Sequence, residues 1–129
     1  MIYIADTHSL LWFLSEDVQL SAKAKQAFDI CEEGRGVIVI PTIVLAELLY
    51  LCEKKGKEEQ FFKVIEKIEE GTNYMTYNLD MKVIAECRNL KKIKEMHDKI
   101  IVATARILKA TIITRDNNIK DSRYADIIW

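Results

Sequence analysis

Apolar and polar residues follow one another along the chain in blocks that predict strands separated by helices. Short runs rich in β-branched or aromatic residues predict strands at Ile2–Ala5, Val37–Ile40, Tyr74–Tyr77, Thr111–Thr114 and Ile127–Trp129. The run Val37–Ile40 is apolar throughout, which is typical of a strand covered on both faces of a parallel sheet.

Helical spacing of apolar residues fills the intervals between these runs. It predicts helices at about His8–Ser15, Ala22–Cys31, Thr42–Lys54, Glu58–Glu70, Leu79–Asn89 and Met96–Ala110. The third helix is expected to bury Ile43, Ala46, Leu49 and Tyr50, and the fourth Phe61, Phe62, Ile65 and Ile68. Because no Asn-Gly or Asp-Gly hairpin signal joins two strands, the order predicts an α/β domain with a central, mostly parallel sheet of four to five strands flanked by helices.

Length and charge narrow the function classes. A chain of 129 residues with half of its residues apolar and 30% charged predicts one compact domain over residues 1–129. The formal net charge of −1 excludes a protein that holds nucleic acid by bulk positive charge, so any nucleic-acid role must use a local site.

Apolar runs and cysteines indicate the compartment. No apolar run approaches the ~20 residues that span a bilayer, and the first residues lack the basic and apolar regions of a signal peptide. Cys31, Cys52 and Cys87 are widely spaced without a Cys-x-x-Cys pair, which predicts reduced, partly buried thiols rather than a zinc site. We therefore expect a cytoplasmic protein with no membrane partner.

Four acidic residues stand at positions where chemistry is expected. Asp6 and Asp116 each follow a predicted strand, so both should lie at the carboxyl edge of the sheet, where open α/β sheets bind ligands. Asp98 begins a largely apolar helix, and Glu47 lies inside an apolar run. If the four converge, like charges about 4 Å apart repel by roughly 4 kcal/mol at an effective dielectric constant near 20, so cations must be present. An oxygen-only ligand set favours Mg²⁺ or Mn²⁺.

Each of these acids also has a purely structural interpretation. Asp6 and Asp98 fit helix N-caps, Asp116 fits a turn residue, and Glu47 fits a surface residue on an apolar-rich helix. Spacing alone leaves both interpretations open.

Four ordered segments contain these acids: Ile4–Trp12, Val44–Leu48, His97–Ala105 and Ile113–Asp116. Together they resemble the signature segments of PIN-domain ribonucleases, and in particular of VapC-type toxins of type II toxin–antitoxin modules. The resemblance covers the whole chain and implies a single PIN-like domain that hydrolyses RNA phosphodiester bonds with Mg²⁺ or Mn²⁺. It implies that the catalytic, metal-binding carboxylates are Asp6, Glu47, Asp98 and Asp116. The chain is most similar to the VapC-type subgroup that opens with Asp-Thr-His-x-Leu-Leu-Trp, as at Asp6–Trp12. One departure is Glu95–Lys99, where that subgroup commonly has Asp-Pro-Phe-Asp-Arg and this chain has Lys for Arg.

Residues next to the four acids in the sequence are candidates for supporting roles. Thr7 and Thr114 either orient the carboxylates through their hydroxyls or simply begin a helix and end a strand. Lys99 and Arg115 are weaker candidates for contacts with the RNA backbone, and His8 fits a packing residue better than a ligand. The lysine run at 91–94 fits a solvated charged face. The resemblance also implies a homodimer and a VapB-type antitoxin partner.

Two other functions fit parts of the pattern. A catalytically inactive PIN-like scaffold that binds RNA or protein would keep the same acids without turnover. A phospho-accepting receiver domain would need paired acids after the first strand and an aspartate at the end of a middle strand. Here Thr7 follows Asp6 and the middle strand ends in Ile40-Pro41, which disfavours the receiver domain.

Overall fold

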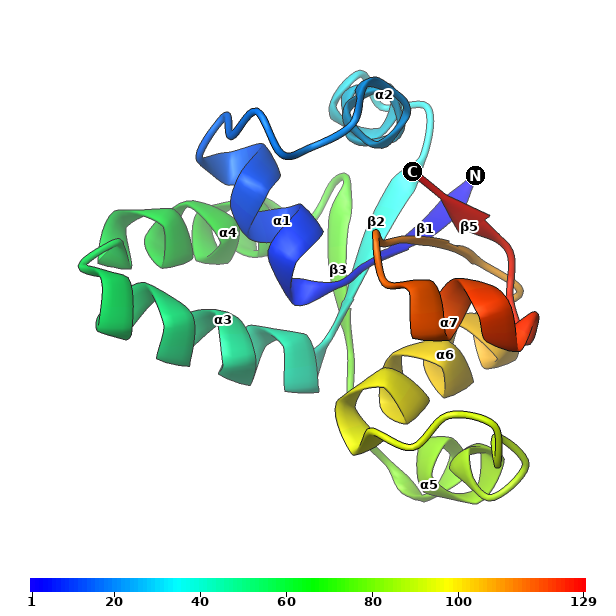
Figure 1. Cartoon of the computed structure of the whole chain (residues 1–129). Helices are drawn as coiled ribbons and strands as arrows, with labels where there is room; N and C mark the ends of the chain where they lie inside the picture. The colour runs from blue at the N-terminus through cyan, green and yellow to red at the C-terminus, as the bar shows by residue number, and fades with distance from the viewer.

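A five-stranded parallel sheet forms the centre of the molecule in a computed structural model that describes residues 1–129 (Figure 1). Its strands are β1 (Ile2–Ala5), β2 (Val37–Pro41), β3 (Tyr74–Tyr77), β4 (Thr111–Ile113) and β5 (Ile127–Ile128). Their spatial order is β3-β2-β1-β4-β5, and every neighbouring pair is parallel. The predicted α/β class and parallel sheet are confirmed.

Seven helices surround the sheet. They are α1 (Thr7–Leu14), α2 (Ala22–Glu32), α3 (Thr42–Lys55), α4 (Glu58–Glu70), α5 (Met81–Cys87), α6 (Met96–Leu108) and α7 (Asn117–Ser122). Helix α2 covers one side of the sheet, while α6 covers the other side and α5 packs on α6 away from the strands (Figure 1). Helices α3 and α4 form an antiparallel pair beside β2 and β3.

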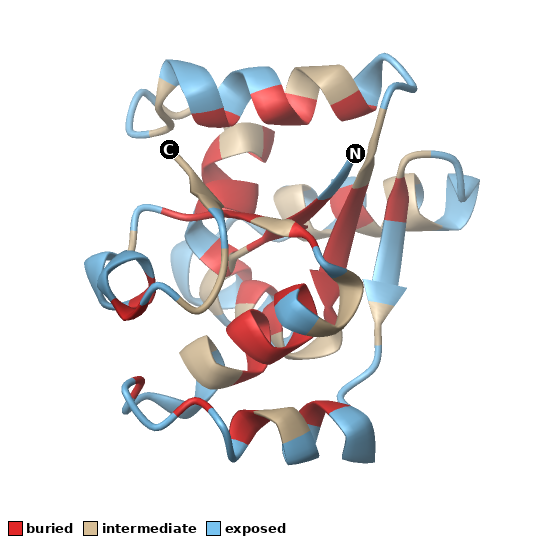
Figure 2. Ribbon diagram, turned by 90° about the vertical axis from the view of Figure 1, so that its right-hand side faces the viewer, coloured by how far each residue is buried: buried red, intermediate tan, exposed pale blue.

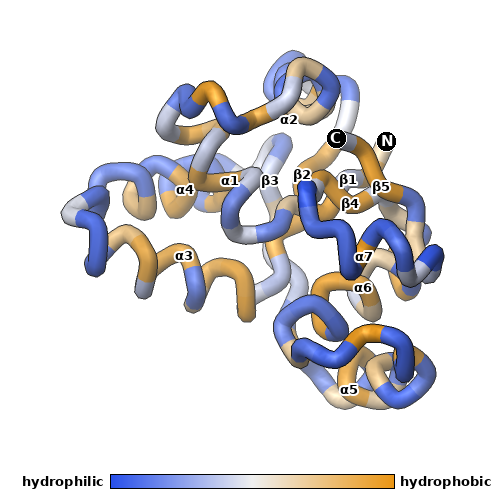
Figure 3. Tube along the Cα trace, viewed as in Figure 1, coloured by the Kyte–Doolittle hydropathy of each residue, from blue (hydrophilic) through white to orange (hydrophobic).

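The core follows the three middle strands and α6. The side chains of Ile4, Ile38, Ile40, Ile112 and Ile113 are completely buried. Figure 2 shows the central strands largely in red, the colour of buried residues. Hydrophobic residues concentrate along the same strands and α6 in Figure 3. Burial of β-branched residues on both faces explains why these runs form parallel strands. It also fixes the strand ends that carry the site.

The predicted inward faces of two helices are wrong in part. In α3 the buried residues are Val44, Leu48 and Cys52, whereas Leu49 is 39% and Tyr50 61% exposed. In α4 only Val64 is buried, and Phe62 is 61% exposed. Helix α3 carries more apolar residues than one packing face needs, so periodicity alone selects the wrong stripe there. In α4, Phe61, Ile65 and Ile68 are half-buried, so only Phe62 faces away from the predicted side.

A third difference is α7, where the sequence predicts only a turn at Asp116. It forms because the Asp116 carboxylate accepts hydrogen bonds from its first amides and caps it. The three cysteines are free and all buried, which confirms the predicted thiols. No helix has the length and apolar character needed to cross a bilayer.

Candidate active site

The connectivity of the sheet reverses at β1. From β1 the chain moves outward through β2 to β3, and it then returns to the other side of β1 to form β4 and β5. In open parallel sheets, ligands bind outside the carboxyl ends of the strands at such a switch point. Asp6 directly follows β1, and Thr114 to Asp116 directly follow β4, so these residues lie at the switch point.

Asp6 is fixed by contacts with two elements. It is the N-cap of α1, where its Oδ1 accepts a hydrogen bond from the Ser9 backbone N–H at 2.9 Å. Its Oδ2 accepts a hydrogen bond from the Thr114 hydroxyl, 108 residues away in the chain. Burial raises the pKa of the Asp6 carboxyl, and the hydrogen bonds from Thr114 and Ser9 oppose that rise. Asp6 is thus both a cap and a member of the cluster.

Thr114 connects Asp6 to Asp116. The buried Thr114 hydroxyl donates to Asp6 and also accepts a hydrogen bond from the Asp116 backbone N–H at 3.1 Å. The Asp116 Oδ1 accepts from the Asn118 and Ile119 amides at 2.7 and 3.2 Å. The hydroxyl therefore holds the backbone after β4 against the carboxylate after β1.

Asp98 lies in the first turn of α6 and is surrounded by other acids. Its pKa is raised to about 6, chiefly by burial and then by the charges of Asp116, Glu95, Asp6 and Glu47. The charges of the other three acids that the sequence singled out therefore act on Asp98. Asp6 and Asp116 line one cavity together, whereas Asp98 lines a different one.

Glu47 lies in the middle of α3, and its charge acts on residues of α6. Its side chain is half-buried, and its charge raises the pKa of both Asp98 and His97. Helix α3 packs directly against α6, which carries those two residues. The apolar run around Glu47 thus reflects a helix packed between other elements.

Glu95 was not assigned a role from the sequence. Its Oε2 accepts a hydrogen bond from the Asp98 backbone N–H at 2.8 Å, which caps α6, and its Oε1 lies 2.7 Å from His97 Nδ1. The hydrogen bond to Glu95 raises the pKa of His97. Asp98 is therefore not the N-cap of its helix. The acid three residues before Asp98 was the available signal for this cap.

The chemistry of these donors fits a hard divalent cation. All are carboxylates, and their mutual repulsion, visible at Asp98, is what a cation would relieve. As the side chains lie, no three His, Cys, Asp or Glu residues come close enough together to bind one ion. Joint binding of an ion therefore requires the carboxylates to approach one another further.

A family model described as PIN domain matches residues 3–123. The chain belongs to the PIN domain family. This confirms the family resemblance drawn from the four segments. No curated protein matches the chain.

Several solved structures are similar in fold to this chain. The PIN domain is similar to a chain of VapBC2 from Rickettsia felis bound to a promoter DNA fragment, with a TM-score of 0.74, 20% identity, and 98% of this chain and 97% of that chain covered. It is also similar to a chain of FitAcB from Neisseria gonorrhoeae, with a TM-score of 0.64, 20% identity and coverage of 98% and 96%. A toxin-antitoxin complex from Klebsiella pneumoniae matches with a TM-score of 0.66, 21% identity and coverage of 89% and 87%. At these identities the likeness establishes the fold.

The supporting residues of the PIN domain lie as follows. Thr7 is buried at the first position of α1, but its hydroxyl forms no hydrogen bond with Asp6. Lys99 is half-buried next to Asp98, and Arg115 is exposed between Thr114 and Asp116. The exposed His8 packs its ring 5.5 Å from that of Trp12, consistent with a packing role.

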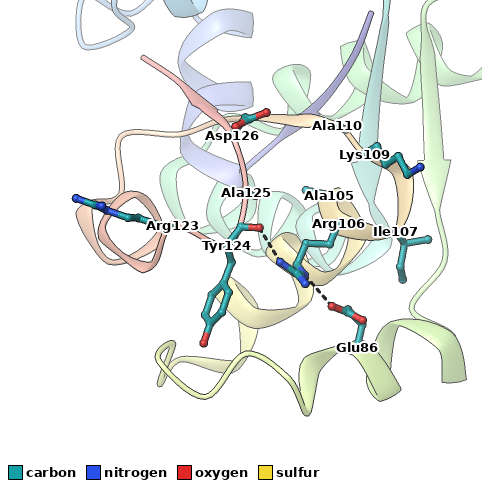
Figure 4. Close-up of a pocket in the computed structure, with 10 residues that line it drawn as sticks. All are labelled: Glu86, Ala105, Arg106, Ile107, Lys109, Ala110, Arg123, Tyr124, Ala125 and Asp126. Carbon is teal, nitrogen blue, oxygen red and sulfur yellow. Dashed lines mark hydrogen bonds and ion pairs between the residues drawn. The ribbon is translucent and has the colours of Figure 1, made fainter.

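Figure 4 shows a cavity that none of the four candidate carboxylates lines. Its volume is about 480 Å³, and its lining includes Ala110 and Asp126, which precede β4 and β5 at the amino edge of the sheet. Arg106 donates to Glu86 at 2.7 Å and to the Tyr124 carbonyl at 2.9 Å, while Arg123 and Lys109 point away from one another. Arg106 is therefore already paired, and the side chains of Lys109 and Arg123 do not converge on one point. This cavity is not part of the candidate site.

Proposed function

We propose that this PIN domain is a metal-dependent endoribonuclease and the toxin of a toxin–antitoxin pair. The observation that carries the proposal is the Thr114 hydroxyl, which links the Asp6 carboxylate to the Asp116 backbone at the switch point of the sheet. The charges of Asp116, Asp6 and Glu47 also raise the pKa of Asp98. Carboxylates that repel one another suit the binding of divalent ions, and such sites serve phosphodiester hydrolysis.

The four carboxylates would hold Mg²⁺ or Mn²⁺. When bound, the ion supplies a water of lowered pKa as nucleophile and stabilises charge on the phosphoryl oxygens. Asp6 and Asp116 receive their relative position from the Thr114 hydroxyl. Glu95 fixes the first turn of α6, and thereby the backbone of Asp98. Thr7 contributes burial at the start of α1 rather than a hydrogen bond to the cluster.

RNA is the proposed substrate, and Lys99 and Arg115 are its proposed backbone contacts. Both cations lie beside the proposed carboxylates in the chain, where they offset the negative charge that RNA would meet. A VapB-type antitoxin is the proposed partner, since structural neighbours were solved in toxin–antitoxin complexes. A homodimer is part of the same proposal, and the exposed Tyr50 and Phe62 offer it apolar surface.

Cleavage of RNA by site variants tests the proposal. Single-stranded RNAs of varied sequence are incubated with wild type, Asp6→Asn and Asp98→Asn, with Mg²⁺, Mn²⁺ or EDTA. We expect wild type to cleave RNA and EDTA to abolish that cleavage. The cleavage rate should fall at least about 100-fold in both variants, because each loses a ligand of the ion. Such a fall corresponds to a loss of ~2.7 kcal/mol of transition-state stabilisation.

The matched control is Asp126→Asn, an exposed acid at the opposite edge of the sheet that should retain full activity. Equal cleavage by wild type and both site variants would show that the carboxylates do not form the site. RNA binding without cleavage under every condition would instead favour the inactive scaffold.

A further inference from the structure

Arg115 is held in place by an aromatic ring rather than by an acid. Its guanidinium carbon lies 4.5 Å from the centroid of the Trp12 ring. Although Arg115 directly precedes Asp116, it forms no ion pair and its side chain makes no hydrogen bond within the chain. Its five N–H donors and one face of its guanidinium plane are therefore available to a ligand.

The ring under Arg115 is itself fixed. Trp12 is only 8% exposed, and its ring contacts His8 at 5.5 Å and Trp129 at 5.9 Å between centroids. A guanidinium resting on an immobile ring loses less conformational freedom when it binds a ligand than one on a free side chain. The stack is thus preorganised for binding.

A cavity of about 450 Å³ joins this stack to the proposed carboxylates. Asp6 and Asp116 line it together with Trp12, Arg115 and Lys55, and Lys55 forms no ion pair either. This volume falls within the 300–1,000 Å³ that is typical of small-ligand pockets. It therefore combines acids, unpaired cations and a planar stacking surface.

We infer that this cavity, the Arg115 subsite, binds the nucleotide next to the scissile phosphate of a single-stranded RNA. The base stacks on the free face of the Arg115 guanidinium, with Trp12 on the other face, and Lys55 pairs with a neighbouring phosphate. Unpaired bases are recognised in this way on guanidinium planes and aromatic rings, whereas bases in a duplex are already stacked. The inference rests on the proposed ribonuclease function and names the part of its substrate that this cavity holds.

Binding measurements without cleavage test the Arg115 subsite. In an Asp98→Asn background with EDTA, the Kd of a labelled single-stranded RNA of about eight nucleotides is measured by fluorescence anisotropy. Arg115→Ala is expected to weaken binding roughly 5- to 100-fold, because stacking contributes ~1–3 kcal/mol per base. Arg115→Lys keeps the charge without the plane, so most of this loss should remain.

A charge-matched control separates stacking from net charge. Arg35 lies before β2 at the opposite edge of the sheet, so Arg35→Ala should change the Kd less than about twofold. RNA should also quench the fluorescence of Trp12 and Trp129, the only tryptophans of the chain, and Arg115→Ala should remove that quenching.

The outcomes distinguish the two proposals. If Arg115→Ala binds RNA as tightly as its parent, or if Arg115→Lys restores full affinity, the Arg115 subsite is wrong. RNA cleavage by wild type would still support the proposed ribonuclease function in that case. No RNA binding by the Asp98→Asn parent, together with no cleavage by wild type, overturns both.

Discussion

Ionised Asp98 works against the stability of the fold. Its carboxyl is partly buried among other carboxylates, and its pKa is raised to about 6 from an ordinary value near 4. The native state therefore binds this proton more readily than the unfolded state does. As the pH rises from about 4 through 6, ionisation of Asp98 lowers the free energy of unfolding, and the loss is complete above pH 6.

Replacement of Asp98 by asparagine should therefore stabilise the metal-free protein. At pH 7.5 in EDTA, we expect the free energy of unfolding of Asp98→Asn to exceed that of wild type by about 1–2 kcal/mol, after allowance for solvent screening of a partly exposed group. The difference should vanish below about pH 4, where Asp98 is protonated in both states. Urea unfolding of both proteins at several pH values measures this difference in free energy. If Asp98→Asn is less stable than wild type at pH 7.5, the prediction is wrong.

Individual side-chain pairs were the least predictable part of the site. That Asp6 and Asp116 share an edge followed from their places after strands, because parallel strands end at the same edge. The Thr114 hydroxyl bond to Asp6 and the stack of Arg115 on Trp12 depend on rotamers and on contacts between distant segments. Hydrophobic patterning carries no information about such contacts.

Helices were predicted more reliably than their faces. The periodic pattern placed six of the helices, but in α3 it selected Leu49 and Tyr50 as buried where the structure buries Val44 and Leu48. All positions of that helix from Ile43 to Cys52 except Glu47 are apolar, so several stripes fit equally well. Helix α7 was missed because it is six residues long, largely polar and dependent on its Asp116 cap.

Adjacent leucines in α3 provide a direct test of the buried face. Leu48 is completely buried and Leu49 is 39% exposed. Leu48→Ala should lower the free energy of unfolding by ~2–5 kcal/mol, through lost burial and the cavity left behind. Leu49→Ala should lower it by less than about 1 kcal/mol. Chemical denaturation compares the two, and similar losses would mean that α3 packs on a different face.

At the scale of the whole molecule, the alternation of strands and helices was enough to predict the parallel sheet. The same fold is shared with a chain of VapBC2 at only 20% identity, which shows how little of the sequence the fold requires. Net charge was less informative. The value of −1 averages over acids gathered at one edge of the sheet and cations beside them, so the total conceals the local charge that a ligand would meet.

The cysteines report on the integrity of the whole core. Cys31, Cys52 and Cys87 are buried in different parts of it, and burial raises the pKa of each thiol, that of Cys31 to about 11. Because the thiolate is the reactive form, Ellman's reagent at pH 8 should modify the native protein at least about tenfold more slowly than the protein in guanidinium. Rapid reaction of any thiol in the native state would show that its region opens easily.

The central position of β1 determines the order in which the proposed site assembles during synthesis. β1 is the first strand to be synthesised, yet one of its two neighbours, β4, begins only at Thr111. A nascent chain can pair β1 with β2 early, but Thr114 and Asp116 join Asp6 only after β4 has been synthesised. A chain that stops before Asp116 therefore lacks the proposed nuclease site.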